Sequence, residues 1–138
     1  VPDYVTYVTL EELLGQSDIV SLHCPLTPET RGLINAERIA LMKKTAVLIN
    51  AARGPVADSR ALADALNEDR IAGAGVDVFE MEPPVPADHP LLHAKNCLVT
   101  PHVAFASEES MKLRADIVFD SLQEWLKGGQ VNTVLPRA

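Results

Sequence analysis

The sequence has 138 residues, 47% of them hydrophobic, and a mean hydropathy near zero, which is typical of one soluble globular domain. Its formal net charge of -7 argues against a nucleic-acid surface, which needs clustered lysine and arginine. No apolar run approaches the ~18 residues of a membrane span, and no signal peptide is visible, so we expect no membrane partner and a cytoplasmic location. Two cysteines without CxxC spacing, Cys24 and Cys97, agree with that reducing compartment.

The first half of the chain alternates between strand and helix patterns. Thr9 and Glu12 have the spacing of a helix capping box, and Gly15 is a typical helix stop. In chain order we expect an extended segment over residues 4–8, a helix from Thr9 to Leu14, a strand over 18–23, a loop over 24–30, a helix from Asn35 to about Met42 and a buried strand over 46–49.

The second half continues the same alternation. In chain order we expect a helix capped by Asp58, a strand over 73–78, a loop over 79–96, a strand over 97–100 and a long helix from Ser107 to about Lys127. The loop holds four prolines, and a loop of that length is usually functional or disordered. The last helix carries one apolar stripe: Met111, Ala115, Val118, Leu122 and Trp125. Because strands alternate with helices, we predict an α/β fold with a parallel sheet.

Three predicted strands end in loops whose side chains can bind anions or transfer protons. The carboxyl ends of parallel strands meet at one edge of a sheet, where ligands bind, so these side chains are expected to gather there. They are Arg53 after the strand over 46–49, the group of Asp77, Glu80 and Glu82 after the next strand, and His102 after the last one.

Such a set suits the reversible reduction of a 2-oxo acid. Arg53 can hold a substrate carboxylate through two parallel hydrogen bonds. A carboxylate beside a histidine fixes the tautomer of the ring and favours its protonated form. A protonated histidine can give a proton to a carbonyl oxygen and take it back. No protein side chain supplies a hydride, so we expect a nicotinamide cofactor.

Each of these residues also has a simpler interpretation. Arg53 alone fits a surface salt bridge, His102 a loop histidine bonded to backbone, and Glu82 a solvated loop acid. Asp77 lies in an apolar strand, and a buried acid needs partners whatever its role.

Other kinds of site have weaker support. His89 and His93 have the spacing of zinc ligands on a helix, but Pro90 argues against a helix there and no third ligand is evident, so no metal is expected. No GxSxG motif supports a serine hydrolase. The segment Gly73–Ala74–Gly75 opens a strand and lacks a third glycine, so it is not a dinucleotide fingerprint.

Four ordered motifs cover nearly the whole chain: Leu22–Ile34 (LHCPLTPETRGLI), Leu48–Pro55 (LINAARGP), Gly75–Pro84 (GVDVFEMEPP) and Thr100–His102 (TPH). Together they resemble the D-isomer-specific 2-hydroxyacid dehydrogenase family, in particular its phosphoglycerate dehydrogenase and glycerate/hydroxypyruvate reductase branches. The resemblance implies that Arg53 binds the substrate carboxylate, that His102 is the acid/base and that Glu82 is its partner.

The resemblance further implies an NAD site, with NADP left open, in which Asp77 contacts the carboxamide. The residues implied to line the nicotinamide half are Cys24, Pro25, Ala51, Ala52, Arg53, His102, Val103, Ala104 and Phe105. The implied partners are a small 2-hydroxy or 2-oxo acid and a second copy of the chain, in a homodimer formed through the NAD-binding domain.

Part of the family's pattern is not found in these residues. Its GxGxxG turn and most of its substrate domain lie upstream of the matching motifs. We therefore expect residues 1–138 to be the second half of a Rossmann-like, doubly wound NAD-binding domain, with a crossover helix over about 107–127 and a tail. These residues alone are expected to be inactive, because the pyrophosphate cradle is missing. Two alternatives stay open: a non-catalytic, corepressor-like binding module and a dimerisation module.

Overall fold

The computed structural model describes residues 2–81 and 84–132 and divides the chain into two compact units. The first unit ends at His102 and the second begins at Val103.

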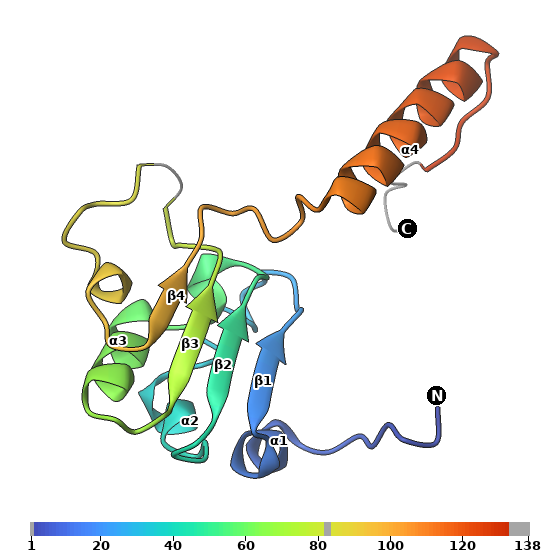
Figure 1. Cartoon of the computed structure of the whole chain (residues 1–138). Coiled ribbons are helices and arrows are strands. Elements are labelled where there is room, and N and C mark those ends of the chain that lie inside the picture. Colours follow the sequence, from blue (N-terminus) through green and yellow to red (C-terminus); the bar gives the residue numbers. More distant parts are fainter. Residues whose placement is uncertain (1, 82–83, 133–138) are drawn as a thin grey trace. The chain divides into compact units, whose positions relative to one another are not determined.

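The first unit is built on a parallel sheet whose strands lie in chain order (Figure 1). The strands are β1 (Ile19–Leu22), β2 (Val47–Asn50), β3 (Gly73–Val76) and β4 (Cys97–Val99). Leu22 pairs with Asn50 and Asn50 with Val76, so these residues align near the carboxyl edge of the sheet. The predicted α/β class and parallel sheet are confirmed, although β1, β3 and β4 are slightly shorter than expected and β2 is shifted by one residue.

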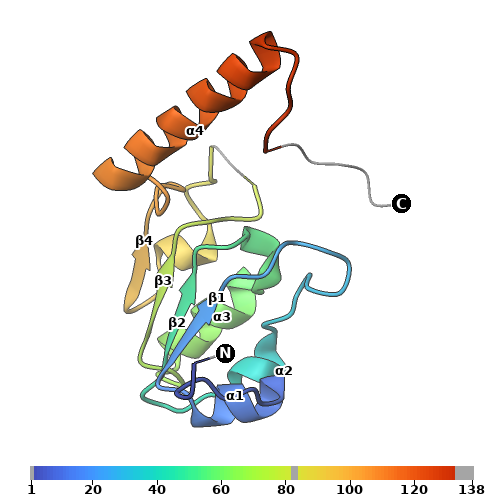
Figure 2. The same cartoon turned by 90° about the vertical axis from the view of Figure 1, so that its right-hand side faces the viewer.

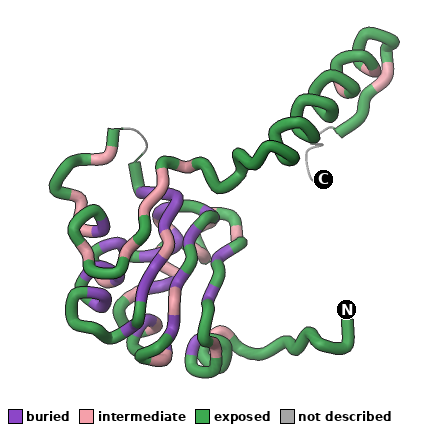
Figure 3. The backbone as a smooth tube through the Cα atoms, viewed as in Figure 1, coloured by how far each residue is buried: buried purple, intermediate pink, exposed green. Residues whose placement is uncertain are grey.

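Helices cover one face of this sheet. Both α2 (Ala36–Ile39) and α3 (Ser59–Asn67) lie on the same side of it (Figure 2). Successive residues of a strand point to opposite faces, so Leu48 is fully buried while its neighbour Ile49 is 37% exposed. The buried positions of the chain gather in the strands and in the helices behind them (Figure 3).

The first helix differs from the prediction at its end. Thr9 caps α1 (Leu10–Gln16) in the expected capping box with Glu12. The predicted stop at Leu14 is wrong, because the helix continues through Gly15 to Gln16. Gly15 is not among the residues with positive φ, so it does not form the left-handed cap that ends many helices. Ser17, in an extended conformation, follows the last helical residue instead.

The second helix is also shorter than predicted. Asn35 caps it as expected, since its side chain accepts a hydrogen bond from the backbone N–H of Arg38 at 3.0 Å. The helix ends at Ile39 rather than near Met42. Beyond that point the N–H groups of Leu41 and Met42 donate to carbonyls three residues earlier, a tighter turn than an α-helix.

The second unit consists mainly of α4 (Glu108–Leu126), which Ser107 caps as predicted. Within this unit the predicted apolar stripe lies on the surface; Leu122 and Trp125 are both more than half exposed. Residues 133–138, which include part of the apolar tail, lie outside the described residues. No helix in the described ranges is long and apolar enough to cross a membrane.

Candidate active site

Arg53 lies in the turn between β2 and a short 3-10 helix, η1 (Gly54–Val56). The buried side chain of Asn50, the last residue of β2, holds this turn at two points. Its Oδ1 accepts from the N–H of Ala52 and its Nδ2 donates to the carbonyl of Arg53, each at 3.1 Å. The sequence run VLIN thus ends in an amide that shapes the turn.

The guanidinium of Arg53 is not engaged in an ion pair with the described part of the chain. Its Nη1 donates to the carbonyl of Ala52 at 2.7 Å. No described carboxylate lies within 4.0 Å of it. The simpler interpretation of Arg53 as half of a surface salt bridge therefore finds no partner among residues 2–81 and 84–132.

Gly54 brings the Arg53 turn against the loop that follows β3. A Cβ added at Gly54 would overlap the backbone carbonyl group of Phe79. Only a residue without a side chain allows this approach. The contact therefore sets the Arg53 turn directly beside Phe79, which follows Asp77 by two residues.

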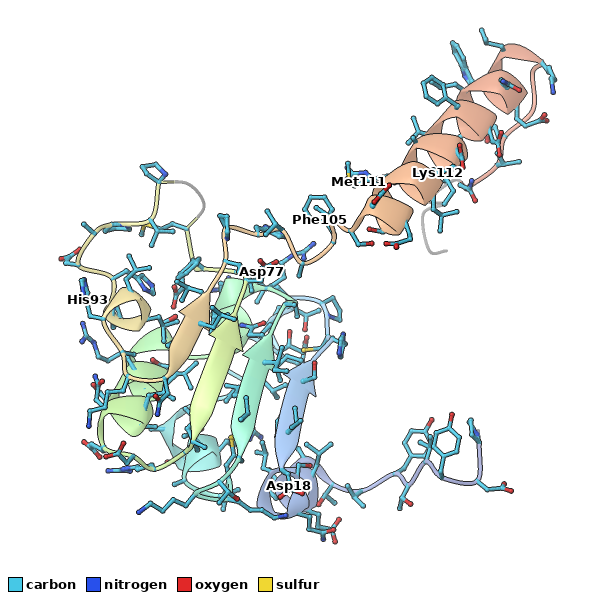
Figure 4. The ribbon with its side chains drawn as sticks, viewed as in Figure 1. Asp18, Asp77, His93, Phe105, Met111 and Lys112 are labelled. Carbon is cyan, nitrogen blue, oxygen red and sulfur yellow. The ribbon has the colours of Figure 1, made fainter. Side chains whose placement is uncertain are left out.

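His102 and Asp77 are tied together at the ends of β4 and β3. Figure 4 shows Asp77 at the carboxyl end of β3. Its side chain, 5% exposed, accepts a hydrogen bond from the hydroxyl of Thr100 at 2.5 Å, so this buried acid has a described partner. The N–H of His102 donates to the carbonyl of Asp77 at 2.8 Å. These bonds hold His102 at φ 55°, a left-handed conformation that few non-glycine residues adopt and that is common at functional sites.

Two open pockets meet at Arg53. One, of about 440 Å³, is lined by Arg53, His102, Arg31 and Glu80 among others. The other, of about 590 Å³, is lined by Cys24, Pro25, Ala51, Ala52 and Arg53 along with neighbouring residues. Both volumes lie in the range of small-molecule sites. The first brings together the two predicted catalytic side chains that the structure describes.

Five of the predicted site residues are not among those that line these two pockets. One of them, Asp77, lines a third pocket together with Thr100 and His102. Glu82 lies outside the described residues, so its pairing with His102 stays a prediction. Val103, Ala104 and Phe105 begin the second unit, and their contact with NAD stays a prediction as well. Within that unit the guanidinium of Arg114 lies over the ring of Phe105, 5.4 Å from its centroid.

His89 and His93 each have a partner of their own. Nε2 of His89 lies 3.1 Å from a carboxylate oxygen of Glu80, and Nε2 of His93 lies 2.6 Å from the carbonyl of Ala87. A 3-10 helix, η2 (Pro90–Leu92), separates them. No cluster of three potential metal ligands is found within the described ranges.

Two groups near the sheet have shifted pKa values. Burial of Glu80 disfavours its charged form, but hydrogen bonds from Ser59, the local backbone and His89 outweigh burial and hold the carboxyl pKa below its ordinary value. Burial raises the pKa of the Cys97 thiol, which makes it a poorer nucleophile.

Sequence patterns did not single out Asn50 or Thr100 as site residues. An asparagine at the end of an apolar strand was an available signal, because a buried amide needs hydrogen-bond partners. Thr100 carried no such signal, since its contact with Asp77 joins residues 23 positions apart.

Comparison with known proteins identifies the family. Residues 2–104 match the family model described as D-isomer specific 2-hydroxyacid dehydrogenase, NAD binding domain. The chain is 51% identical over 128 residues to a hydroxypyruvate reductase of Blautia hydrogenotrophica, covering 93% of this chain and 39% of that protein.

Solved structures agree with this match. A D-isomer specific 2-hydroxyacid dehydrogenase of Lactobacillus delbrueckii, in its NAD complexed form, has a TM-score of 0.83 at 35% identity, over 94% of this chain and 43% of the other. A homologue from Xanthobacter autotrophicus, in complex with NADPH and MES, has a TM-score of 0.74 at 44% identity, over 93% and 41%. The chain spans about two fifths of the length of these three relatives.

The predicted family and the Rossmann-like fold class are confirmed by these matches, as is NAD as the cofactor named for the family. This chain belongs to the NAD-binding domain of the D-isomer specific 2-hydroxyacid dehydrogenase family.

Proposed function

We propose that this chain forms the nicotinamide side of the active site of an oxidoreductase, which transfers a hydride between NAD(P) and a small D-2-hydroxy acid or the corresponding 2-oxo acid. The observation that carries the proposal is the pocket shared by Arg53 and His102. These residues follow different strands and lie 49 positions apart, yet they line one space at the carboxyl edge of the sheet. That edge is where open α/β sheets bind ligands.

The roles of the side chains follow from their chemistry. Arg53 binds the substrate carboxylate through its planar fork of N–H groups. His102 donates a proton to the carbonyl oxygen during reduction and removes it from the hydroxyl during oxidation. Glu82 is the proposed partner of His102, which it would keep in the protonated form. These three assignments also rest on the motifs in which the residues occur.

The pocket around Cys24 and Ala52 fits the nicotinamide half of the cofactor. Its lining includes the small side chains of Ala51 and Ala52, which leave room for a flat ring beside the Arg53 turn. When bound, the nicotinamide supplies or accepts the hydride that no protein side chain can provide. Asp77 is proposed to face the carboxamide, with its carboxylate held by Thr100. The proposal holds for either NAD or NADP as the cofactor.

We also propose what the rest of the protein contributes, which substrate it takes and how it assembles. The relatives are more than twice as long as the matched region, and their remaining length would supply the pyrophosphate cradle and the other wall of the substrate pocket. We propose glyoxylate or hydroxypyruvate as the 2-oxo acid, following the named relatives. We further propose a homodimer formed through this domain and a cytoplasmic location.

Substitution of Arg53 tests the proposal. In the complete polypeptide encoded by the reading frame that contains this chain, Arg53→Ala should lower kcat/KM for hydroxypyruvate about 100-fold or more, because two charge-assisted hydrogen bonds to the carboxylate are lost. Arg53→Lys should recover only part of it, because a lysine cannot form the bidentate contact. Initial rates of NADH oxidation give the measurement.

Arg60→Ala is the matched control, because Arg60 is an exposed arginine on α3 outside the two pockets. It should leave kcat/KM unchanged. An Arg53→Ala protein with full turnover would refute the assignment. Loss of turnover with an intact biological role would favour the corepressor-like module.

A further inference from the structure

Glu80 and His89 close the base of the proline-containing loop that follows β3. Nε2 of His89 and Oε2 of Glu80 lie 3.1 Å apart. The His89 side chain is only 11% exposed, so this pair is far better shielded than the surface ion pairs of the chain. Its interaction is therefore less screened by solvent than theirs.

The contacts of His89 define which ring nitrogen carries the proton. The backbone N–H of Leu91 donates to Nδ1 of His89 at 3.3 Å, so Nδ1 is an acceptor. The other nitrogen, Nε2, then carries the proton and donates to the Glu80 carboxylate. His89 is thus held from both sides, by η2 on one and by Glu80 on the other.

The pair is connected to the Arg53 turn through Phe79. The His89 ring packs edge-on against the ring of Phe79, with centroids 5.1 Å apart and planes at 88°. Phe79 is also the residue whose backbone carbonyl abuts Gly54. Ser59, at the start of the helix that follows the Arg53 turn, also hydrogen-bonds to the Glu80 carboxylate. Phe79 is therefore fixed by the pair on one side and supports Gly54 on the other.

We propose that His89 and Glu80 are positioning residues, which hold Phe79 against Gly54 and thereby keep Arg53 in place for the substrate carboxylate. This inference rests on the proposed function of Arg53. It assigns a role to two residues that are not among the candidate catalytic side chains Arg53, Glu82 and His102. Neither His89 nor Glu80 needs to touch the substrate for this role.

Two substitutions at His89 test the proposal in the complete polypeptide. His89→Phe keeps a ring against Phe79 but removes the donor to Glu80, whereas His89→Gln keeps an N–H donor near the position of Nε2. We expect His89→Phe to raise KM for hydroxypyruvate about tenfold, because small displacements of a positioning group cost that much or more. The Kd for NADH should not change, and His89→Gln should restore KM. His93→Phe, at an exposed histidine four residues away, is the control and should leave KM unchanged.

Hydrogen exchange provides a readout that does not depend on catalysis. The N–H groups of Val56 and Ala57 donate to the carbonyls of Arg53 and Gly54, so their exchange reports on the Arg53 turn. These amides should exchange faster in His89→Phe but not in His89→Gln. Unchanged exchange in His89→Phe would overturn the positioning role, even if the complete protein proves to have another activity. Faster exchange with an unchanged KM in an active enzyme would overturn it as well. If His89→Phe does not fold, His89→Leu, which also lacks a donor to Glu80, is compared in its place, with the same criteria.

Discussion

At the scale of single residues, the site depends on side chains that shape the backbone around Arg53 and His102. Asn50 bonds both sides of the Arg53 turn, and Thr100 bonds Asp77, whose carbonyl in turn holds His102. Buried polar groups need such partners, and each of these is used to fix a neighbouring loop. The pocket is therefore preorganised by residues that do not themselves face a substrate.

Gly54 lies so close to the backbone of Phe79 that a larger residue does not fit there. Gly54→Ala should destabilise the chain by about 2 kcal/mol or more, because an added Cβ overlaps the backbone of Phe79 and the Arg53 turn must move. Urea unfolding followed by circular dichroism gives the measurement. Gly75→Ala, at a glycine whose added Cβ would meet nothing within 4 Å, is the control and should be tolerated. Equal stability of the two variants would contradict the close contact.

At the scale of elements, much of the first unit follows from local sequence patterns. Thr9, Asn35, Asp58 and Ser107 cap the helices that they were predicted to cap, since each supplies an oxygen three residues before an unpaired N–H. The ends of α1 and α2 were missed because they depend on how the following turn is formed, not on the last helical residue. The Glu80–His89 contact was missed because the fold of an irregular loop leaves no periodic pattern.

The loop after β3 should show a specific dependence on pH. The folded state lowers the pKa of Glu80, so its ionised form stabilises the fold. This contribution is complete above the ordinary carboxyl pKa and is lost as the pH falls through the lower folded-state value. The native chain should therefore be more stable than Glu80→Gln at pH 7, and the difference should shrink below about pH 4. Urea midpoints measured from pH 7 to pH 3 give this comparison.

Glu37→Gln is the control for this titration, because Glu37 is an exposed glutamate on α2 outside the described ion pairs. It should change the urea midpoint little at any pH. A Glu80→Gln difference that grows on acidification would have the wrong sign and would contradict the contacts assigned to Glu80.

At the scale of the whole molecule, the chain exposes apolar surface that its relatives' longer sequences could cover. Ile19 and Leu98, on strands β1 and β4, are 63% and 71% exposed, and Trp125 on α4 is 65% exposed. Large apolar side chains exposed within each unit are candidates for burial in an interface. The four motifs predicted the family and the fold, because they follow successive strands of one sheet. They could not predict which surfaces are covered, since that depends on parts of the relatives that this chain does not span.

The 138-residue chain by itself should self-associate. Sedimentation velocity at increasing concentration should show species larger than the 14.9 kDa monomer. Replacing Leu122 and Trp125 together by Glu should reduce the association, because it places charges in the exposed stripe of α4. Gln123→Glu, on the same helix, adds a charge at a polar position and should have little effect. A chain that stays monomeric at every concentration would contradict this interpretation.

The proposed role of the domain is to complete a hydride-transfer site for 2-oxo acids. The most direct measurement incubates the complete polypeptide with hydroxypyruvate and NADH that carries deuterium at the transferring C4 position. We expect the glycerate product to contain one deuterium at C2 and to be the D isomer, and we expect Arg53→Ala to abolish its formation. Three results would contradict the account: product without deuterium, product of the L configuration, or deuterated product formed by the Arg53→Ala variant.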